Sequence, residues 1–400
     1  MNTNSTDKYE VLKYAVVIIL ISIPDIISYY ATVAFLVPMI ILRISMMSVF
    51  LMIFYCTFKD LSKYQSYLMF CFVIMLFLSV INVTPTTPFI TIITICSLMV
   101  FGTFHKKIDI VFFNRALTIC VSVYIPLIIY AILKTNLDIN IVLRRGYTWT
   151  ELFAYATLTP VWVPFLFSSI LTKRKILLAF LFWLLAVFVA LTSLKRQIII
   201  DSALAFVIIL FVASRLKDKI IVRRFAVALI LLIIVVAVGL SKGLFSGVSD
   251  EVFNAMSDRF SETTDDIESF DRFVESKMYF QNEAGVFDIV FGKGFLSAHH
   301  SLPEEHYFLH VGWTNFIFKG GLLLFFVLLS GYRKVFHVFF HPNKYSLESV
   351  FCSMYCVYCF FALLYVNLMG YGVSLYLFFY CLTQINDTRN KKIITNVVAQ

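Results

Sequence analysis

The sequence is poor in charge. Charged residues make up 14% of the 400 residues and hydrophobic residues 60%, against about 25% and about 45–50% in soluble domains. Apolar windows of about 20 residues, the length that crosses a bilayer, recur from Val16 to Leu382. The composition therefore excludes an ordinary soluble globular protein and predicts an all-α, polytopic membrane protein.

Signatures of several other protein classes are also missing. The chain has no Gly-rich nucleotide loop and no dinucleotide-binding fingerprint. All eight cysteines lie inside apolar runs, so neither a disulfide framework nor a zinc motif is present. Cys352, Cys356 and Cys359 have helical spacing, but without a nearby His or carboxylate this suits packing between helices better than metal binding. No small-residue cleavage site follows the first apolar run, which we expect to be retained.

The apolar runs predict about twelve membrane-spanning helices. They lie near 14–31, 33–57, 66–82, 88–104, 116–133, 155–171, 176–193, 197–213, 225–241, 308–330, 348–366 and 369–384. With a cytoplasmic N-terminus, 21 of the 33 basic residues fall in cytoplasmic segments and ten outside. This is the positive-inside bias, so the net charge of +9 indicates orientation rather than nucleic-acid binding.

The predicted organisation has three parts. Residues 1–240 form nine helices with short loops, 241–307 form one large extracytoplasmic loop, and 308–400 form three helices and a cytoplasmic tail. The stretch 241–320 holds 13 of the 24 acidic residues and four of the seven histidines. Because it is the one long polar stretch, we expect it to carry the chemistry.

Within the loop we expect an amphipathic helix followed by a strand-like run. Asp265 and Asp266 are candidate N-caps and Gly285 a stop signal. The helical period leaves Arg272 off the apolar face, available to a ligand or simply solvated. The run that follows, VFDIVFGKGFLSAHH, is apolar and strand-like, and Gly292 and Gly294 end it.

Two basic pairs run against the positive-inside trend. Lys195 and Arg196 occupy a tight outer turn with Asp201 one turn further on, and Arg145 follows another arginine in the second-largest outer loop. Guanidinium groups bind phosphate oxygens bidentately, so both places are candidate phosphate sites. The alternatives are charge neutralisation by Asp201 and, for Arg145, binding to lipid headgroups. Arg43, inside an apolar run, either faces the bundle interior or snorkels.

Three features together resemble a known family. They are the LTSLKRQ turn, the segment DRFVESKMYF followed by GKGF, and a histidine shortly before Gly320 and Gly321 at the entry to an apolar span. They resemble the O-antigen polymerase (Wzy-type) family of the bacterial polysaccharide polymerase and O-antigen ligase group. The family often has His-Asn and then Gly-x-x-Gly. Here Val311 follows His310, which leaves His306 and His310 open as the matching residue, and we favour His310.

The resemblance implies a metal-independent membrane glycosyltransferase without a cofactor, in the bacterial inner membrane with both termini cytoplasmic and the large loop periplasmic. Donor and acceptor would be undecaprenyl-diphosphate-linked oligosaccharides, and the partners would include a chain-length regulator and a flippase. Arg196 and Arg272 would hold the donor diphosphate, assisted by Lys195 and Arg145. His310 would deprotonate or orient the acceptor hydroxyl. His306 and Glu305 are further candidates for substrate binding.

Two alternatives remain open. An O-antigen ligase, which transfers the glycan to lipid A core, would use the same arginines and histidine, although the His-Asn pattern associated with ligases is imperfect here. A lipid-linked oligosaccharide flippase would predict internal repeats with paired broken helices, and no repeat is visible in the sequence.

Overall fold

The computed structural model describes residues 11–22, 61–82, 89–107, 109–134, 156–192, 197–216, 271–299, 308–365 and 372–387. Every element within these ranges is a helix, as the all-α prediction requires. The first helix is Val11–Ser22. The elements that follow before the large loop are α3 (Lys63–Ile81), α4 (Phe89–Phe104), α5 (Ile110–Lys134), a 3₁₀ turn (Ala156–Val161), α8 (Trp162–Thr172), α9 (Ile176–Thr192) and α10 (Gln197–Arg215).

The elements of the large loop and the C-terminal part follow in the same way. They are α13 (Asp271–Met278), a π-helical turn (Tyr279–Glu283), α14 (Val286–Phe291), α15 (Gly312–Phe340), a 3₁₀ turn (Pro342–Lys344), α16 (Leu347–Ala362) and α17 (Gly372–Asn386). Three described helices are long and apolar enough to cross a membrane: Lys63–Ile81, Ile110–Tyr130 and Gly312–Phe340. The fold is therefore that of a helical membrane protein. The total of twelve spans stays a prediction, since those expected at 33–57 and 225–241 lie outside the described residues.

Two predicted elements were wrong in detail. The run VFDIVF, predicted as a strand, is the short helix α14. A six-residue apolar run does not reveal its period, and Asp288 favours the helix by accepting a hydrogen bond from the Gly285 N–H (3.1 Å) at its first turn. The span expected near 308–330 is longer, because α15 continues to Phe340. The helix predicted from Asp265 is described only from Asp271, and it does end before Gly285.

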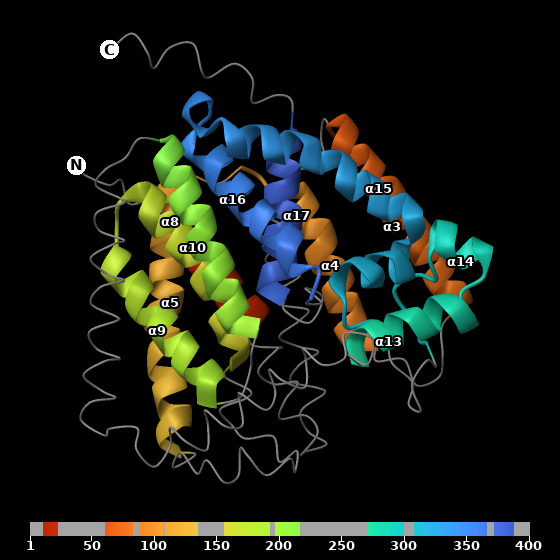
Figure 1. Ribbon diagram of the computed structural model, residues 1–400, viewed down its shortest axis with the longest axis horizontal. Helices are drawn as coiled ribbons and strands as arrows, with labels where there is room; N and C mark the ends of the chain where they lie inside the picture. Colours follow the sequence, from red (N-terminus) through yellow and green to blue (C-terminus); the bar gives the residue numbers. More distant parts are fainter. Residues whose placement is uncertain are drawn as a thin grey trace.

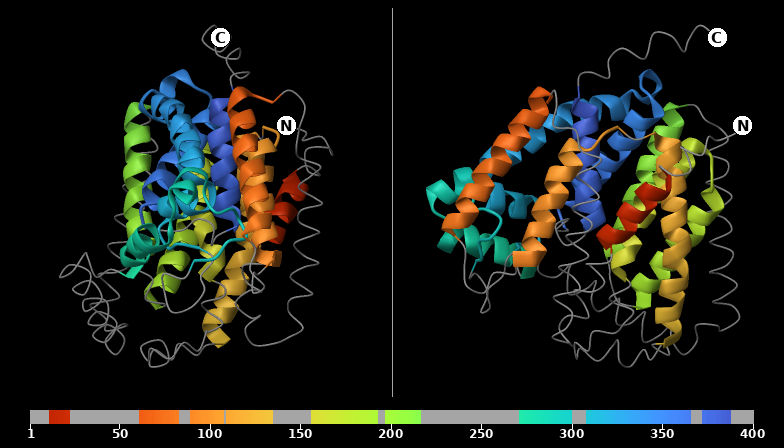
Figure 2. Two further views of the ribbon diagram at one scale, coloured as in Figure 1. Left: turned by 90° about the vertical axis from the view of Figure 1, so that its right-hand side faces the viewer. Right: turned by 180° about the vertical axis from the view of Figure 1, so that it is seen from behind.

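The helices pack side by side in an extended bundle (Figures 1 and 2). On one side α8 packs against α5 and α9, and α10 packs against α16. In the centre α17 lies between α4 and α16. On the other side α15 crosses obliquely, contacting α16, α3 and α14. The helix α15 thus connects the central bundle with the elements of the large loop.

The core beneath the start of α15 is aromatic. Phe316 packs on Phe378 and Phe379 of α17, with ring centroids 6.0 and 6.1 Å apart. The Trp313 indole N–H donates to the carbonyl of Phe360 in α16 (3.1 Å), which satisfies its polar group inside an apolar site. These contacts fix the first turn of α15 against two helices, and this turn directly follows His310.

Candidate active site

The helix α15 is broken at Gly321. Its backbone there has φ 66° and ψ −175°, which is not helical. A break leaves the last carbonyls of the preceding turn without helical partners. Here the carbonyls of Phe318 and Lys319 accept hydrogen bonds from the N–H groups of Lys293 and Gly294, both at 2.9 Å. The segment after α14 therefore caps the first part of α15.

Glycine makes this close approach feasible. Gly292 has φ 81°, a left-handed conformation that side chains disfavour. A Cβ at Gly321 would clash with the backbone of Val290, and one at Gly292 would clash with the carbonyl of Lys319. Gly320 and Gly321, predicted to mark the entry to a span, in fact form the joint at which α14 docks.

Lys319 holds the next stretch of the loop in place. Its side chain is fully buried, and its ammonium donates to the carbonyls of Phe295 (3.0 Å) and Ser297 (2.8 Å). The same nitrogen lies 4.4 Å from the centre of the Phe318 ring and 5.2 Å from that of Phe308. A buried ammonium is tolerated only with such partners. The lysine therefore fixes the chain that leads to His299.

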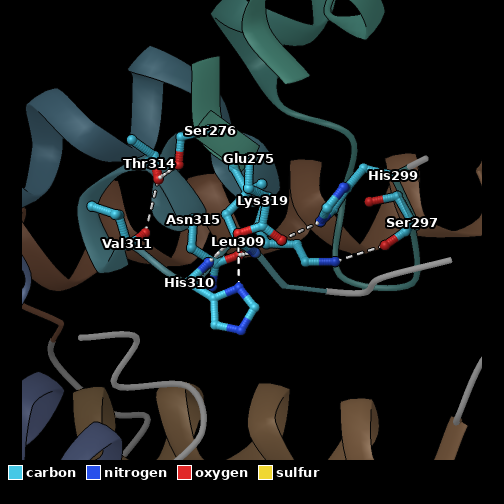
Figure 3. Close-up of polar contacts among 10 residues, drawn as sticks. All are labelled: Glu275, Ser276, Ser297, His299, Leu309, His310, Val311, Thr314, Asn315 and Lys319. Carbon is cyan, nitrogen blue, oxygen red and sulfur yellow. Dashed lines mark hydrogen bonds and ion pairs between the residues drawn. The ribbon is translucent and has the colours of Figure 1, made fainter. Parts of the chain in front are cut away.

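Glu275 of α13 is the polar centre of the site (Figure 3). Its carboxylate oxygen Oε2 accepts hydrogen bonds from the backbone N–H of His310 (3.0 Å) and from Nδ1 of the same ring (2.8 Å). Its other oxygen lies 3.4 Å from Nε2 of His299. An ionised carboxylate can only accept, so Nδ1 of His310 carries the hydrogen of this bond.

Exposure separates the two members of this pair. The Glu275 side chain is 1% exposed, whereas that of His310 is 52% exposed. Burial raises the pKa of the Glu275 carboxyl, but the side-chain and backbone hydrogen bonds from His310, with the charge of the two histidines, more than offset it. The net pKa of Glu275 lies below its ordinary value. The carboxylate is thus kept ionised, and it faces an imidazole that is open to the outside.

Short polar contacts fix the turn that carries His310. Asn315 accepts from the N–H of Leu309 (3.0 Å), and Thr314 donates to the carbonyl of Val311 (2.9 Å). Ser276, next to the buried glutamate, lies 3.0 Å from the Thr314 hydroxyl. The Ser276–Thr314 contact therefore joins α13 to the first turn of α15 beside the hydrogen bonds between Glu275 and His310.

The start of α10 lies at the same end of the bundle as this site. Tyr365 donates to the Asp201 carboxylate of α10 (2.6 Å). Two residues before Tyr365, the carbonyl of Leu363 accepts from the N–H of Trp313 in the first turn of α15 (3.2 Å). This chain of contacts connects α10, which begins at Gln197 directly after Lys195 and Arg196 in the sequence, with the residues next to His310.

The structure places one predicted site residue fully. His310 stands at the start of α15, with its ring bonded to Glu275. Arg272 lies in α13, three residues before Glu275, but its side chain is outside the described part. The other predicted site residues lie outside the described residues altogether; they are Lys195, Arg196, Arg145, His306 and Glu305.

Sequence reasoning missed three residues of the site. Lys319 carried a usable signal, since a lysine inside an apolar run beside two glycines needs partners. His299 was noticed only as one of four histidines in the stretch. Glu275 gave no signal, because a buried carboxylate looks like any other among the 13 acidic residues of the stretch. Only the tertiary contact with His310 identifies it.

A carboxylate that binds Nδ1 of an exposed histidine fixes the orientation of the ring and leaves Nε2 facing the substrate side. Such a pair can take a proton from a hydroxyl group. Among the described residues, no group of three or more His, Cys, Asp or Glu side chains is arranged to hold a metal ion. No protein-family model, no curated protein and no solved structure matches this chain.

Proposed function

We propose that this protein is a membrane glycosyltransferase that polymerises lipid-linked polysaccharide repeat units. It would transfer the growing glycan from undecaprenyl diphosphate to a new undecaprenyl-diphosphate-linked repeat unit, outside the inner membrane. The observation that carries the proposal is the hydrogen bond of 2.8 Å between the buried Glu275 carboxylate and the exposed His310 ring. This bond supplies an oriented base on a bundle of apolar helices. The distribution of basic residues predicts that the base lies outside the cytoplasm.

In the proposed reaction, Nε2 of His310 takes the proton of the acceptor hydroxyl. The hydroxyl oxygen attacks the anomeric carbon of the donor, and the bond from that carbon to the diphosphate oxygen breaks. The diphosphate leaves with the electron pair, so neither an oxidant nor a nucleotide is needed. The ionised Glu275 stabilises the imidazolium that forms.

The leaving diphosphate needs positive charge. In the proposal Arg272 supplies it from α13, the helix that also carries Glu275. Lys195 and Arg196 supply it from the turn before α10. Support for the second assignment comes from the contacts that place the start of α10 near the first turn of α15. Guanidinium groups aimed at a developing charge stabilise it strongly in a site that excludes water.

A flippase is less well supported, although the broken helix α15 is a feature it would share. In transporters, broken helices expose carbonyls and N–H groups to the substrate. Here the carbonyls at the break are occupied by Lys293 and Gly294. The buried carboxylate of Glu275 instead accepts hydrogen bonds from the exposed His310.

The test uses His310→Gln and Glu275→Gln in cells that lack the native protein, with surface polysaccharide separated on a gel. Removing the base should lower the polymerisation rate about 10²- to 10⁴-fold. The surface glycan should then contain a single repeat unit. Glu275→Gln should lower the rate about 10- to 100-fold, because a neutral amide cannot stabilise the positive charge of the imidazolium that forms.

The matched control is His337→Gln, an exposed histidine near the other end of α15, which should give normal chains. Normal long chains from His310→Gln would refute the assignment. A deletion strain that accumulates lipid-linked polymer, and whose lipid A core carries no glycan, would identify a ligase. A ligase would use the same base for a different acceptor.

A further inference from the structure

The short helix α14 exposes an apolar face although it belongs to a loop predicted to be outside the membrane. Val286 is 81% exposed, Phe287 60% and Val290 38%. The opposite side of the helix packs on α15, where the backbone of Val290 meets Gly321. Exposing large apolar side chains to water is unfavourable in free energy. We therefore expect this face to be covered by a partner.

The position of α14 along the bundle indicates what that partner is. The last turn of α3 is bonded to the chain directly after α14: Ser79 accepts from the N–H of Phe295 (2.6 Å), and Asn82 donates to the carbonyl of Lys293 (2.9 Å). Figures 1 and 2 show α14 beside α15 and level with this end of α3. The short helix therefore lies where a candidate membrane span ends.

The surface of α3 at this level is apolar as well. Along its whole length α3 exposes a stripe at helical spacing; its members are Tyr67, Met69, Phe70, Val73, Leu76, Phe77, Val80 and Ile81. A helix long enough to span a bilayer turns such a stripe toward lipid. Because Val80 and Ile81 end the stripe next to the segment that follows α14, the two apolar faces belong to one lipid-facing surface.

The polar groups of α14 are compatible with the boundary of a bilayer. Asp288 accepts from the Gly285 N–H and lies 3.9 Å from the Lys293 ammonium. That ammonium also lies 5.3 Å from the centre of the Tyr279 ring. Charged groups with partners of this kind are tolerated at headgroup level, where amphipathic helices rest with their apolar side in the acyl chains.

We propose that α14 is an interfacial membrane helix, with Val286, Phe287 and Val290 inserted among the acyl chains of the outer leaflet. The occupant of this face is lipid, not a second protein. The helix α14 lies between Glu275 and His299 in the same loop. Its insertion therefore places the candidate site at the level of the lipid headgroups. The inference does not depend on the proposed reaction, and either can fail without the other.

The test places single nitroxide labels on the full-length protein in nanodiscs of phosphatidylethanolamine and phosphatidylglycerol. Val286→Cys, Phe287→Cys and Val290→Cys are compared with Val80→Cys, a 74% exposed position on α3. The matched control is Gln281→Cys, an exposed polar position in the neighbouring π-helical turn. For each label, collision with oxygen, which concentrates in lipid, is measured against collision with a water-soluble nickel chelate.

Labels on α14 should collide with oxygen several-fold more than with the nickel chelate, as at Val80→Cys, while Gln281→Cys should show the reverse. A nickel accessibility at Phe287→Cys equal to that at Gln281→Cys would overturn the proposal. So would protection of the α14 labels from both reagents, or spin–spin broadening between copies, because either shows protein covering this face.

Discussion

At the scale of single residues, the candidate site is built around the carboxylate of Glu275. His310 could be predicted from the sequence, because it shortly precedes an apolar span in a segment that resembles a family motif. Its partner Glu275 could not, because burial of an acidic side chain depends on which distant segment covers it. For Lys319 the sequence indicates that partners are needed but not which ones, since its two carbonyl partners lie 24 and 22 residues earlier in the chain.

The depressed pKa of Glu275 predicts a dependence of stability on pH. A carboxyl whose pKa is lower in the folded state stabilises the fold fully above its ordinary pKa of about 4.3. This contribution disappears as the pH falls through the lower, folded-state pKa. Since hydrogen bonds to a charged group contribute about 1.5–3 kcal/mol, Glu275→Gln should lower the melting temperature by a few degrees near neutral pH.

The measurement is thermal unfolding of the parent protein and of Glu275→Gln in detergent over a series of pH values. The difference between the two should be full at about pH 6–7 and shrink below about pH 4. A difference that stays constant down to the lowest pH would show that the ionised carboxylate has no special role.

At the scale of elements, the sequence predicted most described helices, since a long apolar run leaves few other structures in a membrane. The break in α15 was not predicted, although Gly320 and Gly321 were noticed. Two adjacent glycines are compatible with a straight helix, a turn or a joint, and only the docking of Gly292 and Gly294 selects the joint. For the same reason the strand predicted at VFDIVF was wrong, because its helix is stabilised by packing on α15.

Gly321→Ala should destabilise the joint between α14 and α15. The left-handed backbone alone costs a residue with a side chain about 1–3 kcal/mol, and the added Cβ also clashes with the backbone of Val290. The measurement is hydrogen exchange of residues 286–297, which should become faster than in the parent protein.

Gly285→Ala is the matched control for this joint. A Cβ at Gly285 meets only the Asp288 carboxylate at 3.6 Å, an ordinary contact, and its backbone is extended (φ −74°). Exchange of residues 286–297 should stay near the parent rate in this variant. Equal effects of the two substitutions would show that the joint does not depend on Gly321.

At the scale of the whole molecule, α15 is long and apolar enough to connect the two faces of a membrane. The part after the break at Gly321, residues 322–340, is continuous helix, and its 19 residues at about 1.5 Å each give about 28 Å, close to the hydrocarbon core of about 30 Å. One end carries the loop with Glu275 and the other leads into Pro342–Lys344. We therefore expect the two ends of α15 to face opposite sides of the membrane.

This arrangement predicts the labelling of two exposed positions in intact cells. Gln281→Cys should react with a membrane-impermeant maleimide, because it lies at the end with Glu275, whereas Lys344→Cys should react only after the membrane is opened. The background should be low, since the seven described native cysteines are buried or partly buried. Labelling of Lys344→Cys alone in intact cells would invert the predicted orientation.

The contacts of His299 and His310 make the stretch between them suitable for engineering. Both histidines contact the same buried carboxylate, so the chain between them is anchored at its two ends to one point. Exchanges within residues 300–307 that keep the candidates Glu305 and His306 need not displace His310 or Glu275. This interval is therefore the natural place to graft a new recognition loop.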